Sequence, residues 1–202
     1  MARRIVPKHK ICRKYGEKLC DSVKCPLTKR AYPAGQHGQS QKRAKVSGYG
    51  KQLMEKQKVK KIYGILERQF SNYVEEASKK VGDTSKILLN YLESRLDNVV
   101  YRMGLAPSRT SARQMVTHGH ITVNGEKVDI PSYRVKVGQS IAASKKAQGK
   151  KLLEGISEKL QKVEAPAWLS VDAKAVGGKV LNAPTVENPN FNPKAIIEFY
   201  SR

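Results

Sequence analysis

Apolar residues recur every three or four positions in three stretches of the chain, a spacing that is typical of amphipathic helices. These stretches cover 51–77, 85–103 and 145–164. Gly82 follows the first and Gly104 the second, and glycine is the residue that most often ends a helix. The pattern therefore predicts three helices of three turns or more.

Between the second and third stretches the pattern changes from helix to sheet. Ser108 is placed to cap a short helix, which Gly119 would end. Residues 121–130 alternate between apolar and polar positions around Asn124-Gly125. This dipeptide is the strongest short hairpin signal, because both turn residues must tolerate a positive φ.

The alternation continues beyond this hairpin and into the C-terminal part of the chain. We expect 133–137 to extend the sheet and Ile141 to begin a further strand. Residues 168–171 and 195–200 are predicted as short strands. The Asn/Pro-rich segment 182–193 between them is predicted as a loop.

These elements predict an α+β protein with three parts. Residues 1–50 contain several Gly and Pro and few periodic apolar positions, so they are expected to form an irregular extension. Residues 51–93 form a helical domain, which about 161–202 completes. Residues 94–160 form an inserted domain in which two helices pack on a small twisted antiparallel sheet.

Charge is the most unusual property of the composition. The 202 residues include 39 Lys and Arg against 17 Asp and Glu, a formal net charge of +22. Residues 1–61 hold 18 of the basic residues and three acidic ones. Such a surplus repels itself unless a polyanion neutralises it, which argues against a small-molecule enzyme and for a nucleic-acid partner.

Apolar runs such as Ile87–Leu89 are far shorter than the ~20 residues that a membrane span needs. The N-terminus lacks an apolar signal segment. We therefore expect a cytoplasmic protein, in which three cysteines indicate a metal site or buried thiols rather than disulfides.

The three cysteines and one nearby histidine have the spacing of a zinc knuckle. His9, Cys12, Cys20 and Cys25 give His-x2-Cys-x7-Cys-x4-Cys. Zinc prefers four tetrahedral N and S ligands, and a site with four protein ligands is structural because no position is left for water. His37 is a rival fourth ligand, and the alternative is three free thiols beside an RNA-facing histidine.

Basic side chains also gather in the inserted domain. Arg95, Arg102, Arg109 and Arg113 come from several of its predicted elements, and Lys127 follows in the hairpin. The planar guanidinium fork forms bidentate hydrogen bonds with phosphate. The helix beginning after Ser108 adds backbone N–H donors.

At these residues the chain resembles the S4-type RNA-binding domain, and over nearly its whole length it is similar to the bacterial ribosomal protein S4 family. The stretches that carry the resemblance are 94–102, 108–114 and 118–125, with 33–38, 55–58, 67–70 and 199–202 in the flanks. The resemblance implies a primary binder of 16S ribosomal RNA that nucleates assembly of the small subunit among neighbouring ribosomal proteins. It also implies a place where messenger RNA enters and a contribution to translational accuracy.

The residues expected to contact RNA are basic or polar and lie in the extension, the first helix and the inserted domain. They are Lys42, Arg43, Lys45, Lys51, Lys58, Lys60, Lys61, Arg68, Arg95, Asn98, Tyr101, Arg102, Ser108, Arg109, Arg113, Gln114, His118 and Lys127. The resemblance places the first three near messenger RNA. As structural alternatives, Asp97 and Asn98 bridge or cap within the domain, and Tyr101 belongs to the core.

An RNA-modifying enzyme and a free-standing RNA-binding regulator are the two alternatives to the ribosomal function. Arg95-Leu96-Asp97 matches a three-residue fragment around the catalytic Asp of some pseudouridine synthases, but the chain has no P-loop and no His-Glu-x-x-His motif. A free-standing RNA-binding regulator is the remaining alternative. Binding to its own messenger is compatible with the ribosomal function, and we expect no catalysis.

Overall fold

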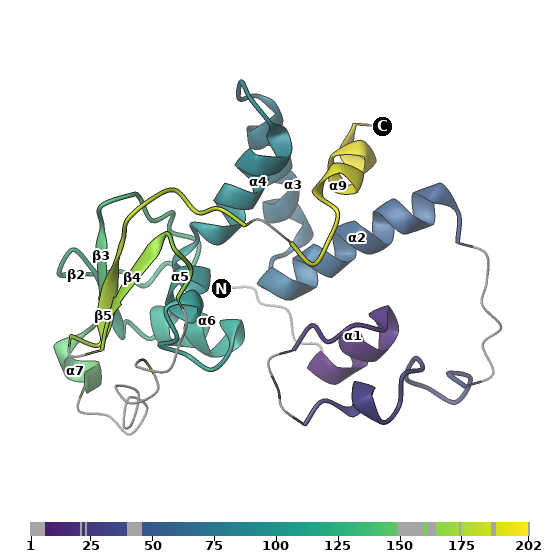
Figure 1. The fold of residues 1–202 in the computed structure, drawn as a ribbon, viewed down its shortest axis with the longest axis horizontal. Coiled ribbons are helices and arrows are strands. Elements are labelled where there is room, and N and C mark those ends of the chain that lie inside the picture. Colours follow the sequence, from purple (N-terminus) through teal and green to yellow (C-terminus); the bar gives the residue numbers. More distant parts are fainter. Residues whose placement is uncertain are drawn as a thin grey trace. The chain divides into compact units, whose positions relative to one another are not determined.

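A computed structural model describes most of the chain (Figure 1). The chain forms two compact units. The described residues are 7–20, 22, 24–39, 46–148, 160, 165–173, 175–186 and 189–201. The first unit comprises Met1–Ser85 and Asn188–Arg202, and the second comprises Lys86–Glu187. Within the described ranges, no helix has the length and apolar character needed to cross a membrane.

The first unit is helical. Its elements are α1 (Lys8–Tyr15), the 3-10 helix η1 (Pro26–Thr28), α2 (Gly48–Tyr63), α3 (Glu67–Ser78) and α9 (Pro193–Tyr200). The C-terminal helix α9 packs against both α2 and α3. The extension predicted as irregular therefore contains two short helices, α1 and η1, which its Gly and Pro content concealed.

The single helix predicted for 51–77 is wrong, because the chain turns at Gly64. This glycine adopts φ 66°, a left-handed conformation that ends α2 and allows α3 to begin three residues later. Gly64 lies within an otherwise continuous apolar period. The spacing of the apolar residues therefore did not reveal the break.

The strand predicted for 195–200 is also wrong, since these residues form α9. The Asn192 side chain accepts hydrogen bonds from the backbone N–H groups of Lys194 and Ala195, at 3.0 and 3.3 Å. Pro193 occupies the first helical position, where its fixed φ suits a helix. The cap decides the structure of this short apolar run.

The second unit combines short helices with an antiparallel sheet. After α4 (Thr84–Glu93), which begins at its boundary, come α5 (Leu96–Arg102), α6 (Arg109–Thr117), β1 (Ile121–Val123), β2 (Glu126–Lys127), β3 (Ser140–Ala143), α7 (Lys145–Gln148), β4 (Leu169–Asp172) and β5 (Gly177–Val180). The strand order is β2-β1-β3-β5-β4. All neighbouring strands are antiparallel.

The predicted hairpin is confirmed, with Asn124 at φ 51° and Gly125 at φ 87° between β1 and β2. Strand β5 was not predicted because it opens with two glycines. A Cβ at Gly177 or Gly178 would collide with the backbone of a neighbouring strand, so glycine permits the close pairing of β5 with β3 and β4.

The helix predicted for 85–103 is interrupted at Arg95, which has the extended values φ −64° and ψ 136°. Arg95 forms an isolated antiparallel bridge with Arg134. Residues 133–137 therefore do not form the predicted strand of the sheet. Their backbone groups bond to 94–96 instead, with Val135 N donating to Ser94 O at 2.8 Å.

The C-terminal part of the chain divides between the two units. The prediction that about 161–202 completes the helical domain is wrong in part, because β4 and β5 belong to the sheet of the second unit and only α9 belongs to the first. Of the helix predicted for 145–164, the described residues are α7 and the helical Leu160. The rest of that prediction lies outside the described residues.

The second unit has a continuous apolar core. Residues from α5, α6, all the longer strands and Trp168 contribute to it, including Leu96, Val99, Val100, Met103, Ala112, Val116, Ile121, Ile141, Trp168 and Val180. Because α5 and α6 each bury one face in this core, the residues on their other faces are held in fixed positions.

Candidate nucleic-acid interface and metal site

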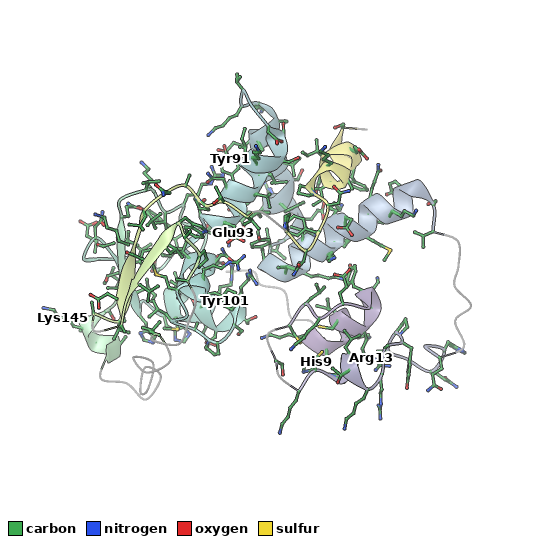
Figure 2. The ribbon with its side chains drawn as sticks, in the orientation of Figure 1. His9, Arg13, Tyr91, Glu93, Tyr101 and Lys145 are labelled. Atoms are coloured by element: carbon green, nitrogen blue, oxygen red, sulfur yellow. The ribbon has the colours of Figure 1, made fainter. Side chains whose placement is uncertain are left out.

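The corner between α5 and α6 holds most of the basic side chains predicted as a site in the second unit. The Ser108 Oγ accepts a hydrogen bond from Ser111 N at 3.3 Å, which confirms the predicted cap of α6. The two helices pack directly against each other. Glu93 and Tyr101, labelled in Figure 2, mark two members of the polar cluster at this corner.

Asp97 binds two of the arginines. Its carboxylate accepts hydrogen bonds from Arg95 Nε at 3.0 Å and from Arg95 Nη2 at 2.7 Å. Arg113 Nη1 donates to the same carboxylate at 3.1 Å. Arg95 is fully buried, whereas the Arg113 side chain keeps 19% of its surface exposed. Asp97 thus fixes Arg113 from α6 at the edge of the cluster.

Glu93 is the second buried carboxylate. It accepts a hydrogen bond from Asn98 Nδ2 at 2.8 Å and two from Arg102, at 3.0 and 2.9 Å. The oxygen of Asn98 in turn accepts a hydrogen bond from Arg109 Nε at 2.9 Å. Arg109 also lies over the Tyr101 ring, 4.4 Å from its centroid. Glu93 therefore orients Arg102 directly and Arg109 through Asn98.

The cluster contains four arginines and two carboxylates, so it keeps an excess of two positive charges. The carboxylates are buried while Arg102 and Arg113 remain partly exposed, with 32% and 19% of their side chains accessible. Guanidinium groups held in this way lose little entropy when they bind an anion. The arrangement suits recognition of phosphate groups.

The predicted RNA contacts differ widely in exposure. The exposed ones are Lys51, Arg68, Gln114, His118 and Lys127. The half-buried ones are Lys60, Lys61, Tyr101, Arg102, Ser108, Arg109 and Arg113. Lys58, Arg95 and Asn98 are buried. Lys42, Arg43 and Lys45 lie outside the described residues.

In the first unit, several of the lysines predicted as RNA contacts are bound to other side chains. Lys58 pairs with Glu17 at 2.6 Å, and Lys61 donates to the Tyr15 hydroxyl at 3.1 Å. Lys60 pairs with Glu67, as does Lys56, which was not predicted as an RNA contact. These contacts leave Lys51 as the exposed lysine among those predicted on α2.

Glu67 is the charged centre of the α2, α3 and α9 packing. Its carboxylate also accepts a hydrogen bond from the Tyr200 hydroxyl at 2.7 Å. Partial burial would raise the pKa of Glu67, but hydrogen bonds from Lys56, Lys60 and Tyr200 outweigh it and lower the pKa to about 2. Burial and the Glu67 carboxylate raise the pKa of Tyr200 above its usual range.

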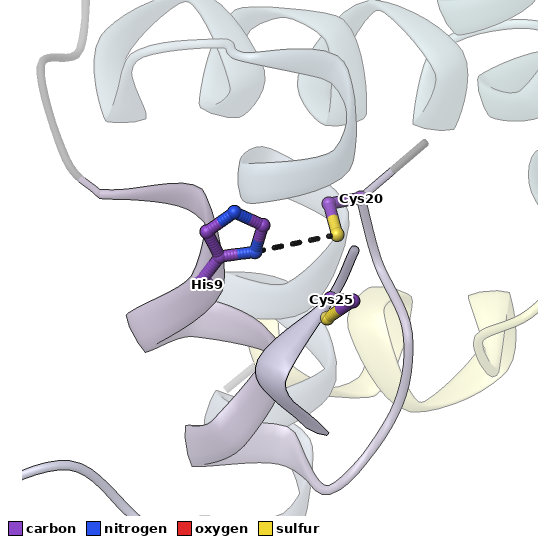
Figure 3. Close-up of side chains that lie close together, drawn as sticks. All are labelled: His9, Cys20 and Cys25. Atoms are coloured by element: carbon purple, nitrogen blue, oxygen red, sulfur yellow. Dashed lines mark hydrogen bonds between the residues drawn. The ribbon is translucent and has the colours of Figure 1, made fainter. Parts of the chain in front are cut away.

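Among the described residues, His9, Cys20 and Cys25 form a group able to bind a metal ion (Figure 3). Their ligand atoms all lie within 4.8 Å of one another, and Cys20 Sγ is 3.8 Å from His9 Nδ1. In tetrahedral zinc sites, bonds of 2.0–2.3 Å place neighbouring ligand atoms about 3.5–3.8 Å apart. The observed spacing therefore fits one ion with small adjustments.

Local structure brings these ligands together. His9 and Cys12 lie three residues apart on α1 and so on one face of the helix. The left-handed Gly16, at φ 69°, ends α1 and lets the chain turn back toward Cys20. Cys25 immediately precedes η1. The group thus joins three segments that are short of apolar residues.

The predicted ligand Cys12 lies outside the group of three but is fully buried beside it. Its thiol interacts with those of both Cys20 and Cys25. A hydrogen bond from the backbone of Leu27 lowers the pKa of Cys25 to about 7, and burial raises the pKa of Cys20 to about 11. The rival ligand His37 is exposed and is not in the group.

Glu93 is a site residue that the sequence pattern did not indicate. It is fully buried and binds Asn98 and Arg102. A single acid directly after the apolar Leu92 and shortly before the spaced arginines Arg95 and Arg102 was the available signal. The alternative in which Asp97 bridges within the domain agrees with its contacts to Arg95 and Arg113.

Comparison with known proteins assigns the chain to a family. Residues 3–93 match the Ribosomal protein S4/S9 N-terminal domain, and residues 94–141 match the S4 domain. The chain is 49% identical to the small ribosomal subunit protein uS4 of Thermus thermophilus, over the full length of both chains. It belongs to the uS4 family. The uS4 proteins of Acetivibrio thermocellus and Roseiflexus castenholzii are 49% and 48% identical, again over both full lengths.

Membership of the uS4 family confirms the resemblance noted in the sequence. The boundary between the two matches falls at 93/94, directly after α4 and at the bend that precedes α5. The S4 match ends at residue 141, inside β3. Strands β4 and β5 therefore extend the sheet beyond the matched part of this uS4 chain.

Proposed function

We propose that this chain is a structural component of the small ribosomal subunit, located in the cytoplasm, that binds 16S ribosomal RNA and has no catalytic activity. The observation that carries the proposal is full-length identity of 46–49% to proteins named uS4. The charge of +22 and the paired arginines of the second unit support an RNA partner. Neighbouring small-subunit proteins are further partners implied by the family.

The proposed RNA-contacting residues of the second unit are those that are accessible on α5, on or next to α6, and on β2. These are Tyr101, Arg102, Ser108, Arg109, Arg113, Gln114, His118 and Lys127. Arg95 and Asn98, which are buried, act as positioning residues together with Asp97 and Glu93. In the first unit Lys51 and Arg68 are exposed, Lys60 and Lys61 are partly so, and the paired Lys58 contributes mainly to packing.

A role at the entrance of messenger RNA, with an effect on translational accuracy, belongs to the same proposal. It rests on the resemblance and on the basic residues Lys42, Arg43 and Lys45. Nucleation of subunit assembly rests on the resemblance as well. Both depend on RNA binding by the chain as a whole.

We further propose that the metal is a structural Zn²⁺ held by His9, Cys12, Cys20 and Cys25. Three of these residues have ligand atoms within 4.8 Å of one another, and the thiol of Cys12 interacts with both other thiols. Sulfur-rich sets of four ligands favour zinc and leave no open position for a substrate. The ion would stabilise residues that have little apolar core of their own.

The proposed function is tested by filter binding of the full chain to a transcript of the 5′ domain of 16S ribosomal RNA, at several salt concentrations. We expect specific retention with an affinity that falls steeply as salt rises, because phosphate contacts release counterions. An unrelated RNA of the same length is the control. Equal affinity for both RNAs would contradict specific ribosomal RNA binding and favour a general polyanion binder.

A further inference from the structure

A hollow at α6 has a different chemical character from the arginine cluster. It has a volume of about 240 Å³ and is lined by Ser111, Gln114, Met115, His118 and His120. Four of these residues come from α6 or its end, at the three- and four-residue spacing of one helix face. The fifth, His120, immediately precedes β1.

The lining offers flat and polar groups rather than fixed charge. The imidazole rings of His118 and His120 lie 5.9 Å apart and are tilted by 52°. The buried Met115 supplies an apolar floor, and the exposed Gln114 supplies amide donors and an acceptor. None of the five lining residues is an arginine, a lysine or an acid.

A cationic group is found at the rim of the hollow instead. The Lys127 side chain crosses Gly119, the residue between the two histidines, so closely that a Cβ at Gly119 would collide with it. Gly119 adopts φ 67°, which brings His118 and His120 to the same side.

We propose that this hollow receives one unstacked RNA base, while Lys127 contacts an adjoining phosphate. Single-stranded RNA is commonly recognised in this way, with a splayed base stacked on planar side chains and its edge bonded to amides. The volume is below the 300–1,000 Å³ typical of small-molecule pockets, which fits one base better than a larger ligand. The inference rests on the proposed RNA-binding function.

The test follows the histidine ring signals of the full-length protein by NMR. The chain has four histidines, so His9 and His37 serve as internal references for His118 and His120. The probes are single-stranded hexanucleotides of adenosine, cytidine or uridine, the same ribose-phosphate hexamer without bases, and a short RNA duplex. We expect at least one hexanucleotide to shift His118 and His120, and the base-free hexamer and the duplex to leave them unchanged.

Two variants test the same hollow with the 5′-domain transcript. Gln114→Ala removes the amide and Ser111→Leu fills the space, and each is expected to weaken binding roughly fivefold or more, the effect of losing one stacked base. Thr110→Ala is the matched control, because Thr110 is an exposed polar residue of α6 outside the hollow. Circular dichroism establishes that each variant is folded.

The outcomes separate this inference from the function on which it rests. Equal histidine shifts with the base-free hexamer would overturn the inference and indicate a phosphate site. Unmoved histidines together with unchanged transcript affinity of Gln114→Ala and Ser111→Leu would also overturn it, while specific transcript binding by the wild type would keep the proposed function intact. Failure of the wild type to bind the transcript specifically would contradict the proposed function itself.

Discussion

The two units hold their charged side chains in different ways. In the second unit, the carboxylates of Glu93 and Asp97 are buried next to an apolar core and bind three of the four arginines of the cluster. In the first unit, Glu67 binds Lys56 and Lys60 while 46% of its side chain stays exposed. A pair between a carboxylate and a basic side chain therefore contributes differently to the free energy of unfolding in the two units.

The N-terminal part of the first unit makes the contrast sharper. Its buried cluster consists of Cys12, Cys20 and Cys25, with Leu19 and Leu27 packed beside it. A cluster of this size buries too little apolar surface to offset the entropy of ordering the chain. The second unit is ordered by its core, whereas this part has little core of its own, and the proposed metal ion would supply the missing stabilisation.

The largest expected effect comes from removing a metal ligand by Cys20→Ser. Structural zinc contributes about 10–16 kcal/mol of apparent binding free energy in small zinc domains, so losing a ligand should unfold residues 8–38 locally. We expect loss of stoichiometric zinc by elemental analysis and faster hydrogen exchange in 8–38, with the second unit unchanged. Lys24→Ala, at an exposed position between two of the ligands, is the control. Full zinc retention in Cys20→Ser would contradict the proposed site.

The next largest effect should come from Asp97→Ala in the second unit. The substitution leaves Arg95 buried without its carboxylate, and breaking a buried pair in this way costs about 3–5 kcal/mol of unfolding free energy. Urea denaturation measures the loss. Asp129→Ala removes an exposed aspartate from the same unit and should change stability by less than about 0.5 kcal/mol. Equal losses of unfolding free energy in Asp97→Ala and Asp129→Ala would contradict the larger contribution expected of the buried carboxylate.

A smaller effect is expected on RNA binding when Arg113 is replaced. Arg113→Ala should weaken binding to the 5′-domain transcript by about 1–3 kcal/mol and reduce the salt slope by about one ion, as for one lost phosphate contact. Arg113→Lys retains the charge and tests the need for the planar fork. Lys136→Ala is a control that removes one exposed positive charge from the same unit. If both alanine variants lose the same affinity, the contact is general electrostatic attraction.

The smallest effect is the pH dependence due to Glu67 in the first unit. Its pKa of about 2 lies below the ordinary value of 4.5, so its stabilisation is present above pH 4.5 and is lost as the pH falls toward 2. We expect Glu67→Gln to lower the unfolding free energy by about 1 kcal/mol at pH 7, because solvent screens the half-exposed pair, and by less at pH 3. Denaturation curves at both pH values measure the difference. Glu75→Gln, which removes an exposed pair with Lys79, should show a smaller pH effect.

Local signals in the sequence predicted several elements correctly. Asn124-Gly125 predicted the β1–β2 hairpin, because a turn needing two positive φ values is recognisable from two residues. Ser108 predicted the start of α6 for a similar reason. The break at Arg95 could not be predicted in this way, since it depends on pairing with Arg134, which lies 39 positions further along the chain.

The sequence by itself determined the uS4 family, the concentration of positive charge in the first 61 residues, and the set of cysteines and histidines available to a metal. Only the tertiary structure decided which of the basic residues remain accessible. Arg95 and Arg113 look alike in the sequence, yet one is fully buried against Asp97 and the other lies at the edge of the cluster. Composition and local spacing show which chemical groups are present, but the burial and the partner of each group follow from contacts between distant segments.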